Sequence, residues 1–148
     1  MSKIIEICIA KKKGDKLINV VNIEARAGKG LVGDRKFKEN NNKKQQLTLI
    51  EIENINYFNK ISRSSIPAIN FRRNIITQGV SLNDLNGKIF RIGSVKVRAH
   101  DLCHPCKYLQ DILKFENLIK VLLNKSGLRC EILTDGKLSI GDVIQHND

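Results

Sequence analysis

Residues 98–113, R-A-H-D-L-C-H-P-C-K-Y-L-Q-D-I-L, join a strand pattern to a helix pattern through two closely spaced cysteines. Just before the cysteines, apolar residues alternate with Lys and Arg over residues 95–99, which is typical of a half-buried strand. After them, residues 109–113 carry Leu and Ile at helical spacing. We therefore expect a strand that runs into Cys103 and a helix that begins at Cys106.

Cys106 has the surroundings of a reactive or metal-binding sulfur. Pro105 suits the first turn of a helix, where its missing N–H is not needed. In that turn, free backbone N–H groups and the positive end of the helix dipole favour a thiolate, and Lys107 adds a positive charge. Cys103 is the candidate resolving thiol, since it could form a disulfide with an oxidised or persulfidated Cys106.

The composition bounds the class of protein. A chain of 148 residues with 41% hydrophobic residues predicts one folded domain with a real core. No apolar run approaches the length of a membrane span, and residues 1–13 lack the charge order and cleavage site of a signal peptide. We therefore expect a cytoplasmic protein without a membrane partner.

The net charge of +11 favours an anionic partner, such as nucleic acid, a phosphorylated cofactor or an acidic protein. A solvated, lysine-rich surface explains most of this charge on its own. In a cytosolic chain, a close cysteine pair indicates chemistry or metal binding more than a disulfide. Cys8 and Cys130 lie in apolar runs, where we expect small core residues.

Short apolar runs separated by glycine turns predict a mainly β fold. The expected fold class is a closed or partly closed antiparallel β-barrel with a few short helices. Strands are expected at residues 3–10, 17–24, 45–50, 68–77, 88–91, 95–99, 128–134, 137–140 and 143–146, and helices at 51–60 and 109–124, the second with a break near 114–116.

A glycine-rich loop at residues 25–35 has two open interpretations. Gly28, Gly30 and Gly33 would let backbone N–H groups approach an anion, or they could simply form a tight connection between strands. The loop is not a P-loop, because the G-x-x-x-x-G-K-[ST] order is absent.

Six segments, in order, resemble the MOSC domain, a family named for the C-terminal domain of molybdenum cofactor sulfurase. They are G-L-V-G-D-R at 30–35, Q-Q-L-T-L-I-E at 45–51, F-R-R-N-I-I-T at 71–77, L-N-G-K-I-F-R-I-G at 85–93, C-H-P-C at 103–106 and G-L-R-C-E-I-L-T-D-G-K-L-S-I-G-D-V-I at 127–144. The resemblance spans nearly the whole chain and identifies it as a small, standalone MOSC domain over residues 1–148.

The resemblance implies a β-barrel that binds molybdenum cofactor (molybdopterin), carries sulfur on a cysteine, or does both. Cys106 matches the family cysteine, so it would ligate molybdenum or hold a persulfide. Arg72 and Asn74 match the Phe-Arg-x-Asn motif near the pterin phosphate, and Arg35 and Gln45 match other elements and are candidate cofactor-binding residues. An Arg offers phosphate a fork of donors, and a thiolate is a soft metal ligand.

The same resemblance bears on partners and activity. A sulfur-donor protein such as a cysteine desulfurase is an expected partner, whereas we expect no pyridoxal phosphate site in this chain. Whether the chain is itself an enzyme stays open: sulfur transfer and molybdenum-dependent reduction, each with a partner protein, are the two options. The final substrate and the oligomeric state also stay open.

Other interpretations remain beside this one. His100, Cys103, His104 and Cys106 could form a zinc site, although structural zinc usually needs two separated ligand pairs. Arg72 could simply face solvent. A small basic RNA-binding barrel without catalytic activity is the alternative function, but such barrels need aromatic stacking platforms, and this chain has no Trp, two Tyr and five Phe. Nucleic acid is therefore the less favoured partner.

Overall fold

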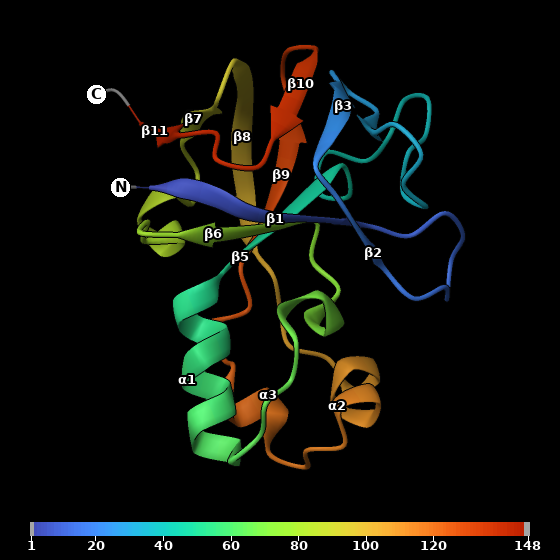
Figure 1. Cartoon of the computed structure of the whole chain (residues 1–148). Helices are drawn as coiled ribbons and strands as arrows, with labels where there is room; N and C mark the ends of the chain where they lie inside the picture. The colour runs from blue at the N-terminus through green and yellow to red at the C-terminus, as the bar shows by residue number, and fades with distance from the viewer. Residues whose placement is uncertain (1, 147–148) are drawn as a thin grey trace.

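The structure, a computed structural model, describes residues 2–146 and places a curled sheet above a small helical lobe (Figure 1). The strands are β1 Lys3–Ile9, β2 Ile18–Val20, β3 Asn22–Arg26, β4 Gly30–Leu31, β5 Leu47–Glu51, β6 Ile75–Gln78, β7 Ile89–Ile92, β8 Val95–Leu102, β9 Leu128–Ile132, β10 Gly136–Ser139 and β11 Ile144–Gln145. The helices are α1 Ile52–Ser62, α2 Lys107–Leu113 and α3 Leu118–Val121, with 3₁₀ turns η1 Ala68–Phe71 and η2 Leu82–Leu85.

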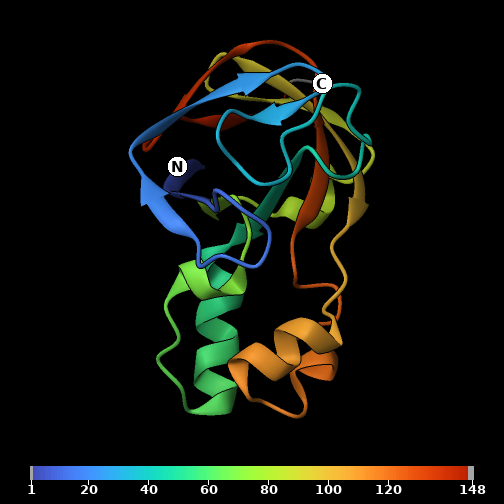
Figure 2. The same cartoon turned by 90° about the vertical axis from the view of Figure 1, so that its right-hand side faces the viewer.

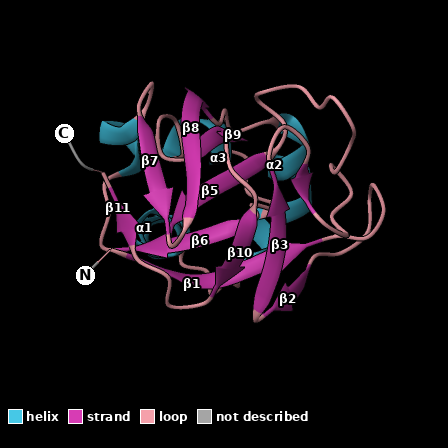
Figure 3. Ribbon diagram, turned by 90° about the horizontal axis from the view of Figure 1, so that it is seen from above, coloured by secondary structure: helices cyan, strands magenta, loops and turns pink. Residues whose placement is uncertain are grey.

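Eight strands form one strongly curled sheet in the order β11-β7-β8-β9-β5-β6-β1-β2, and β10, β3 and β4 form a second, three-stranded sheet (Figure 3). All pairs are antiparallel except β5 with β6. The predicted mainly β fold is confirmed, but the sheet is a half-barrel rather than a fully closed barrel. An isolated bridge between Lys3 and Val143 and a few backbone hydrogen bonds join the start of the chain to residues 141–144, but among the described residues the two-residue β11 forms no ladder along β1.

Three central strands are buried on both faces, so two cores form. Because side chains alternate across a strand, Ile7 of β1 packs inside the half-barrel while the neighbouring Cys8 packs against the helical lobe. The second core joins the outer face of the sheet to α1, α2 and α3 through residues such as Phe58 and Leu109. Figure 2 shows these helices together below the sheet. Helix α2 directly follows residues 103–106, the cysteine segment, which contains the two cysteines.

Most of the sequence predictions for the secondary structure hold, and the largest exception is at residues 68–77. The predicted break in the second helix is confirmed at Lys114, which adopts a left-handed conformation with φ of 55° and ends α2. Residues 68–77 are not one strand: η1 fills 68–71, and Arg72 turns the chain with φ of 63° before β6 begins. Buried Phe71 anchors this turn in the lower core, which local strand propensity does not report.

Among the glycines that the structure describes, Gly127 has the least room for a side chain. A Cβ atom placed on it would lie 1.7 Å from the carbonyl oxygen of Leu49 in β5, and its φ of +100° suits glycine. The same glycine accepts the backbone N–H of Cys103 through its carbonyl at 2.7 Å. Close packing of Gly127 on β5 thereby fixes where the cysteine segment leaves β8.

Among residues 2–146, no helix combines the length and the apolar character that a bilayer crossing requires.

Candidate functional site

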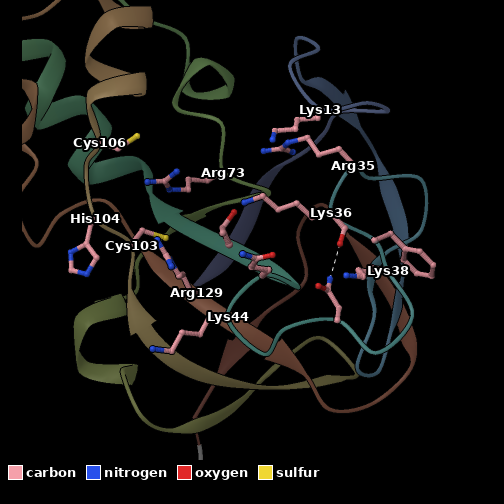
Figure 4. Close-up of a pocket in the computed structure, with 14 residues that line it drawn as sticks. Lys13, Arg35, Lys36, Lys38, Lys44, Arg73, Cys103, His104, Cys106 and Arg129 are labelled. Atoms are coloured by element: carbon pink, nitrogen blue, oxygen red, sulfur yellow. Dashed lines mark hydrogen bonds between the residues drawn. The ribbon is translucent and has the colours of Figure 1, made fainter.

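A cavity of about 590 Å³ opens beside the cysteine segment, between the sheet and the loop that precedes β5 (Figure 4). Its walls come from β5, β9, the cysteine segment and the loops around residues 13, 35–45 and 73. The lining residues are Lys13, Arg35, Lys36, Phe37, Lys38, Asn41, Lys44, Gln45, Thr48, Arg73, Cys103, His104, Cys106 and Arg129.

The lining is strongly cationic. It contains seven Lys or Arg residues and no Asp or Glu, and Figure 4 shows these side chains arranged around the hollow. A concave surface lined by one sign of charge focuses the electrostatic potential and attracts the opposite charge. The cavity is therefore suited to an anion.

Carboxylates outside the cavity neutralise only two of these cations. The Arg35 guanidinium lies 3.1 Å from the buried Asp34 carboxylate, and the Lys44 ammonium lies 3.5 Å from Asp101. Arg73 donates from Nε to the Ser126 carbonyl at 3.0 Å, which fixes the guanidinium without neutralising it. Within residues 2–146, the remaining cavity cations form no ion pair.

The pKa of Lys36 is affected by the positive charges that surround it in the cavity. Its side chain remains open to solvent, yet it lies among many protein atoms in the cavity. Desolvation, followed by the charges of Arg35 and Arg73, lowers the pKa of Lys36 below its ordinary value, and Asp34 only partly offsets this. A bound anion would relieve the repulsion.

Cys106 is the exposed thiol of the site. It caps the N-terminus of α2, and its Sγ accepts the backbone N–H of Leu109 at 3.4 Å. The predicted start of the helix at this cysteine is confirmed within one residue. Pro105, however, precedes the cap instead of occupying the first turn, because Cys106 itself has extended dihedral angles and its side chain supplies the cap.

The other three cysteines are buried. Cys103 lines the cavity with 4% of its surface exposed, whereas Cys8 and Cys130 are fully buried. Burial, then the charge of Glu6, raises the pKa of Cys8 to about 12, against the effect of a hydrogen bond from Asn19. Burial also raises the pKa of Cys130. The expectation that Cys8 and Cys130 are small core residues is confirmed.

Arg72 and Asn74 are not among the residues that line the cavity. The Asn74 side chain is buried in the sheet: its amide donates to the Cys8 carbonyl at 3.1 Å, and its oxygen accepts from the Thr48 backbone N–H at 3.1 Å. Arg72 donates to the Asp15 carbonyl and lies over the Tyr108 ring. Their assignment to a cofactor stays a prediction, and Arg73 is the residue of this motif that lines the cavity.

Arg35 and Gln45 do line the cavity together with both cysteines, so four of the six predicted residues share it. Sequence reasoning missed most of the cations. Arg73 and Lys36 stand beside predicted residues, so a wider reading of those motifs would have found them. Lys13 and Lys44 lie in loops, where no local pattern indicates the direction of a side chain.

The zinc interpretation finds no support in the geometry. Within residues 2–146, no three His, Cys, Asp or Glu side chains come together in a way that could hold a metal ion. His100, one of the proposed ligands, places Nε2 at 2.8 Å from the Glu131 carboxylate.

Comparison with known proteins gives one family and one fold. The model of the MOSC domain family matches residues 31–145. The crystal structure of YuaD from Bacillus subtilis is similar, with 18% sequence identity and a TM-score of 0.84, and the match covers 97% of this chain and 94% of that one. The crystal structure of YiiM from Geobacillus stearothermophilus is also similar, with 18% identity and a TM-score of 0.79, over 100% of this chain and 76% of that one. YiiM from Escherichia coli is similar too, with 18% identity and a TM-score of 0.74, over 100% of this chain and 71% of that one. At this identity the structures establish a shared fold alone. No curated protein sequence matches significantly.

Proposed function

The chain belongs to the MOSC domain family, and on this premise we propose that it binds molybdenum cofactor in the cationic cavity, with Cys106 as the sulfur that meets the metal. One observation carries the proposal: a cavity lined by seven cations and no carboxylate also has two cysteines in its wall. Such a lining suits a ligand that joins an anionic phosphate to a metal able to accept a thiolate.

The residues present fit such a cofactor. Arg73 and Arg129 offer planar forks of donors to the phosphate of the pterin, and Lys36 adds a point charge. Cys106 offers an exposed thiol. A molybdenum ion held by its own organic cofactor needs fewer protein ligands than a bare ion, so a single cysteine suffices. When bound, the group would supply the redox chemistry of a molybdenum-dependent reduction.

The test is the metal and pterin content of protein purified from a cofactor-replete host. Molybdenum is measured by mass spectrometry, and pterin by fluorescence after oxidation. We expect Cys106→Ser to lose molybdenum more than pterin, and the double variant Arg73→Gln, Arg129→Gln to lose both. Cys103→Ser is the matched control and should keep most of the molybdenum. Wild-type protein with no more molybdenum than the double variant would overturn the proposal.

Sulfur transfer is the second candidate, and the contrast between the two thiols favours it. Exposed Cys106 is open to a donor protein such as a cysteine desulfurase, while buried Cys103 is three positions earlier in the chain. In the proposed step, the Cys103 thiolate attacks the inner sulfur of a Cys106 persulfide. A Cys103–Cys106 disulfide forms, both cysteine sulfurs end in it, and the outer sulfur leaves reduced as hydrosulfide.

Alkylation at neutral pH, followed by peptide mass spectrometry, tests this second function. Cys106 should label first and Cys103 more slowly, while Cys8 and Cys130 should label only after unfolding, since burial raises their pKa. After incubation with a desulfurase and cysteine, the Cys106 peptide should gain the mass of one sulfur atom. Cys103→Ser should retain that mass for longer. If Cys103 labels before Cys106, the family cysteine is assigned to the wrong residue.

A filter-binding assay with single-stranded RNA across salt separates both functions from the RNA-binding alternative. Tight, salt-sensitive retention by a protein that carries neither molybdenum nor sulfane sulfur would favour RNA binding.

A further inference from the structure

Most cations of the cavity fall into two groups on opposite sides of the hollow (Figure 4). We call Arg73, Arg129 and Lys44, which lie beside the cysteines, the sulfur side. We call Lys13, Arg35 and Lys38, which come from the two loops across the hollow, the loop side. Lys36 extends from one of these loops toward Arg73 and lies between the two groups. All seven line the same cavity.

The two groups together carry more charge than one phosphate can neutralise. A phosphate monoester has a charge of about −1.5 to −2 at neutral pH. Each side has one cation paired with a carboxylate, Lys44 on the sulfur side and Arg35 on the loop side. Within residues 2–146, five cavity cations remain without such a partner: Lys13, Lys36, Lys38, Arg73 and Arg129.

The unpartnered charges come from both sides of the hollow, and their sum exceeds the charge of a single phosphate. Arg73 is held in place on the sulfur side by its hydrogen bond to the Ser126 carbonyl. On the loop side, Asp34 accepts the backbone N–H of Ala10 and also pairs with Arg35. Asp34 thereby fixes the base of the loop from which Lys36 and Lys38 extend. Desolvation, followed by the charges of Arg35 and Arg73, lowers the pKa of Lys36.

We infer that the cavity binds an organic diphosphate, with one phosphate against the sulfur side and the second against the loop side. This inference rests on the proposed function and names the ligand class more narrowly. The ligand would be a nucleotide-linked form of the pterin cofactor or a free nucleoside diphosphate, because both present the same pair of phosphates. Charge-assisted hydrogen bonds from two separate groups of cations give the selectivity for two phosphates over one.

Calorimetric titration of the wild-type protein with phosphate, pyrophosphate, GMP and GDP tests the inference. We expect pyrophosphate and GDP to bind about tenfold or more tightly than phosphate and GMP, since each added charged hydrogen bond has an effect of this size. GDP binding tighter than pyrophosphate would indicate that the nucleoside also makes contacts. Equal binding of the two would indicate recognition of the diphosphate alone. Equal affinity for phosphate and pyrophosphate would overturn the inference.

A loop-side double variant, Lys13→Met with Lys38→Met, sharpens the result. It should lower pyrophosphate affinity about tenfold while leaving phosphate affinity unchanged. The matched control, Lys60→Met with Lys120→Met, removes the same charge from exposed lysines of α1 and α3 and should change neither. An equal loss in variant and control would indicate attraction by net charge only and would overturn the inference.

Molybdenum content of the same preparations separates this inference from the proposed function. Bound molybdenum without selectivity for pyrophosphate would overturn the diphosphate site alone. Selectivity for pyrophosphate without molybdenum in any preparation would overturn the proposed function and support the site. Displacement of pyrophosphate by a single-stranded oligonucleotide at equimolar concentration would indicate a general polyanion surface and overturn the site.

Discussion

The polar junction at Asn74 and the cationic cavity share one residue, Thr48, but treat polar groups in opposite ways. At the junction, Thr48 and Asn74 exchange hydrogen bonds through their side chains and backbones, and Asn74 also holds the Cys8 carbonyl. Among the described residues, no buried side-chain nitrogen or oxygen lacks a hydrogen-bond partner. In the cavity, five cations have no carboxylate partner within residues 2–146.

This difference separates structural from binding residues inside one motif. F-R-R-N places three polar side chains in succession, yet Asn74 joins strands, Arg73 lines the cavity and Arg72 lies over Tyr108. Burial requires polar groups to be satisfied by the protein itself, whereas a binding site keeps charge available for a ligand. Accounting for partners therefore distinguishes roles that the motif alone leaves mixed.

The largest expected effect is a loss of stability from substitution of Gly127 in the packed part of the fold. In Gly127→Ala, the new Cβ would meet the Leu49 carbonyl at 1.7 Å, so β5 and the cysteine segment cannot both keep their places. We expect a loss of at least about 4 kcal/mol in the free energy of unfolding, measured by urea denaturation or as insoluble protein. Gly141→Ala is the control: its φ is +93°, but the new Cβ would meet no atom within 4 Å other than its chain neighbours, so it should cost only about 1–2 kcal/mol.

Asn74→Ala tests the junction itself. It removes the side-chain bonds to Thr48 and to the Cys8 carbonyl, which leaves buried polar groups unsatisfied. We expect a loss of about 2–3 kcal/mol in unfolding free energy with phosphate affinity retained in the folded fraction. Asn83→Ala, which breaks one exposed bond to the Asn124 carbonyl, is the control. Normal stability with lost phosphate binding would make Asn74 a binding residue after all.

Arg73 and Arg72 test the cavity side. Arg73→Gln should weaken phosphate binding by about 1.5–3 kcal/mol, the range of charged hydrogen bonds, because the guanidinium lines the cavity. Arg72→Gln removes the same single charge but should have little effect on phosphate affinity, because Arg72 donates to the Asp15 carbonyl. Calorimetric titration with phosphate measures both. The reverse order would restore Arg72 to the role predicted from the motif.

Lys36 offers the smallest effect, with a definite sign. Its folded-state pKa is lowered, so between that value and the unfolded value of about 10.4 the unfolded chain binds more protons. The contribution of Lys36 to the free energy of unfolding of the wild-type protein should therefore rise as pH increases through that window. Lys36→Met should be slightly more stable than wild type at neutral pH, by less than about 1 kcal/mol because solvent screens the side chain. The advantage should disappear towards pH 10 in urea denaturation, and phosphate should reduce it.

Much of the fold followed from local pattern, and the exceptions have a physical cause. Alternating and continuous apolar runs predicted most strands, because burial on one or two faces leaves a direct record in sequence. The prediction of one strand over residues 68–77 failed, because burial of Phe71 favours η1 over the local strand propensity. Whether the barrel closes fully was left open by the sequence, since closure depends on how far the short β11 reaches along β1, which no local pattern encodes.

The candidate site was predictable where chemistry and local structure coincide. Cys106 was found because its helix cap is a local feature. Lys13, Lys38 and Arg129 were missed, since their approach to one cavity depends on how loops and strands distant in sequence come together. The motif resemblance reached Arg35 and Gln45 but could not distinguish Arg73 from Arg72.

The place of β5 at the middle of the sheet has a consequence for synthesis. Leu47 of β5 pairs with Cys130 of β9, so one edge of β5 has no partner until nearly the whole chain has left the ribosome. At about 5–20 residues per second, that interval is on the order of ten seconds. An apolar strand with an open edge is a template for pairing with other chains. We expect chaperone dependence during translation, so additional chaperone should raise the soluble yield more than any gain in final stability.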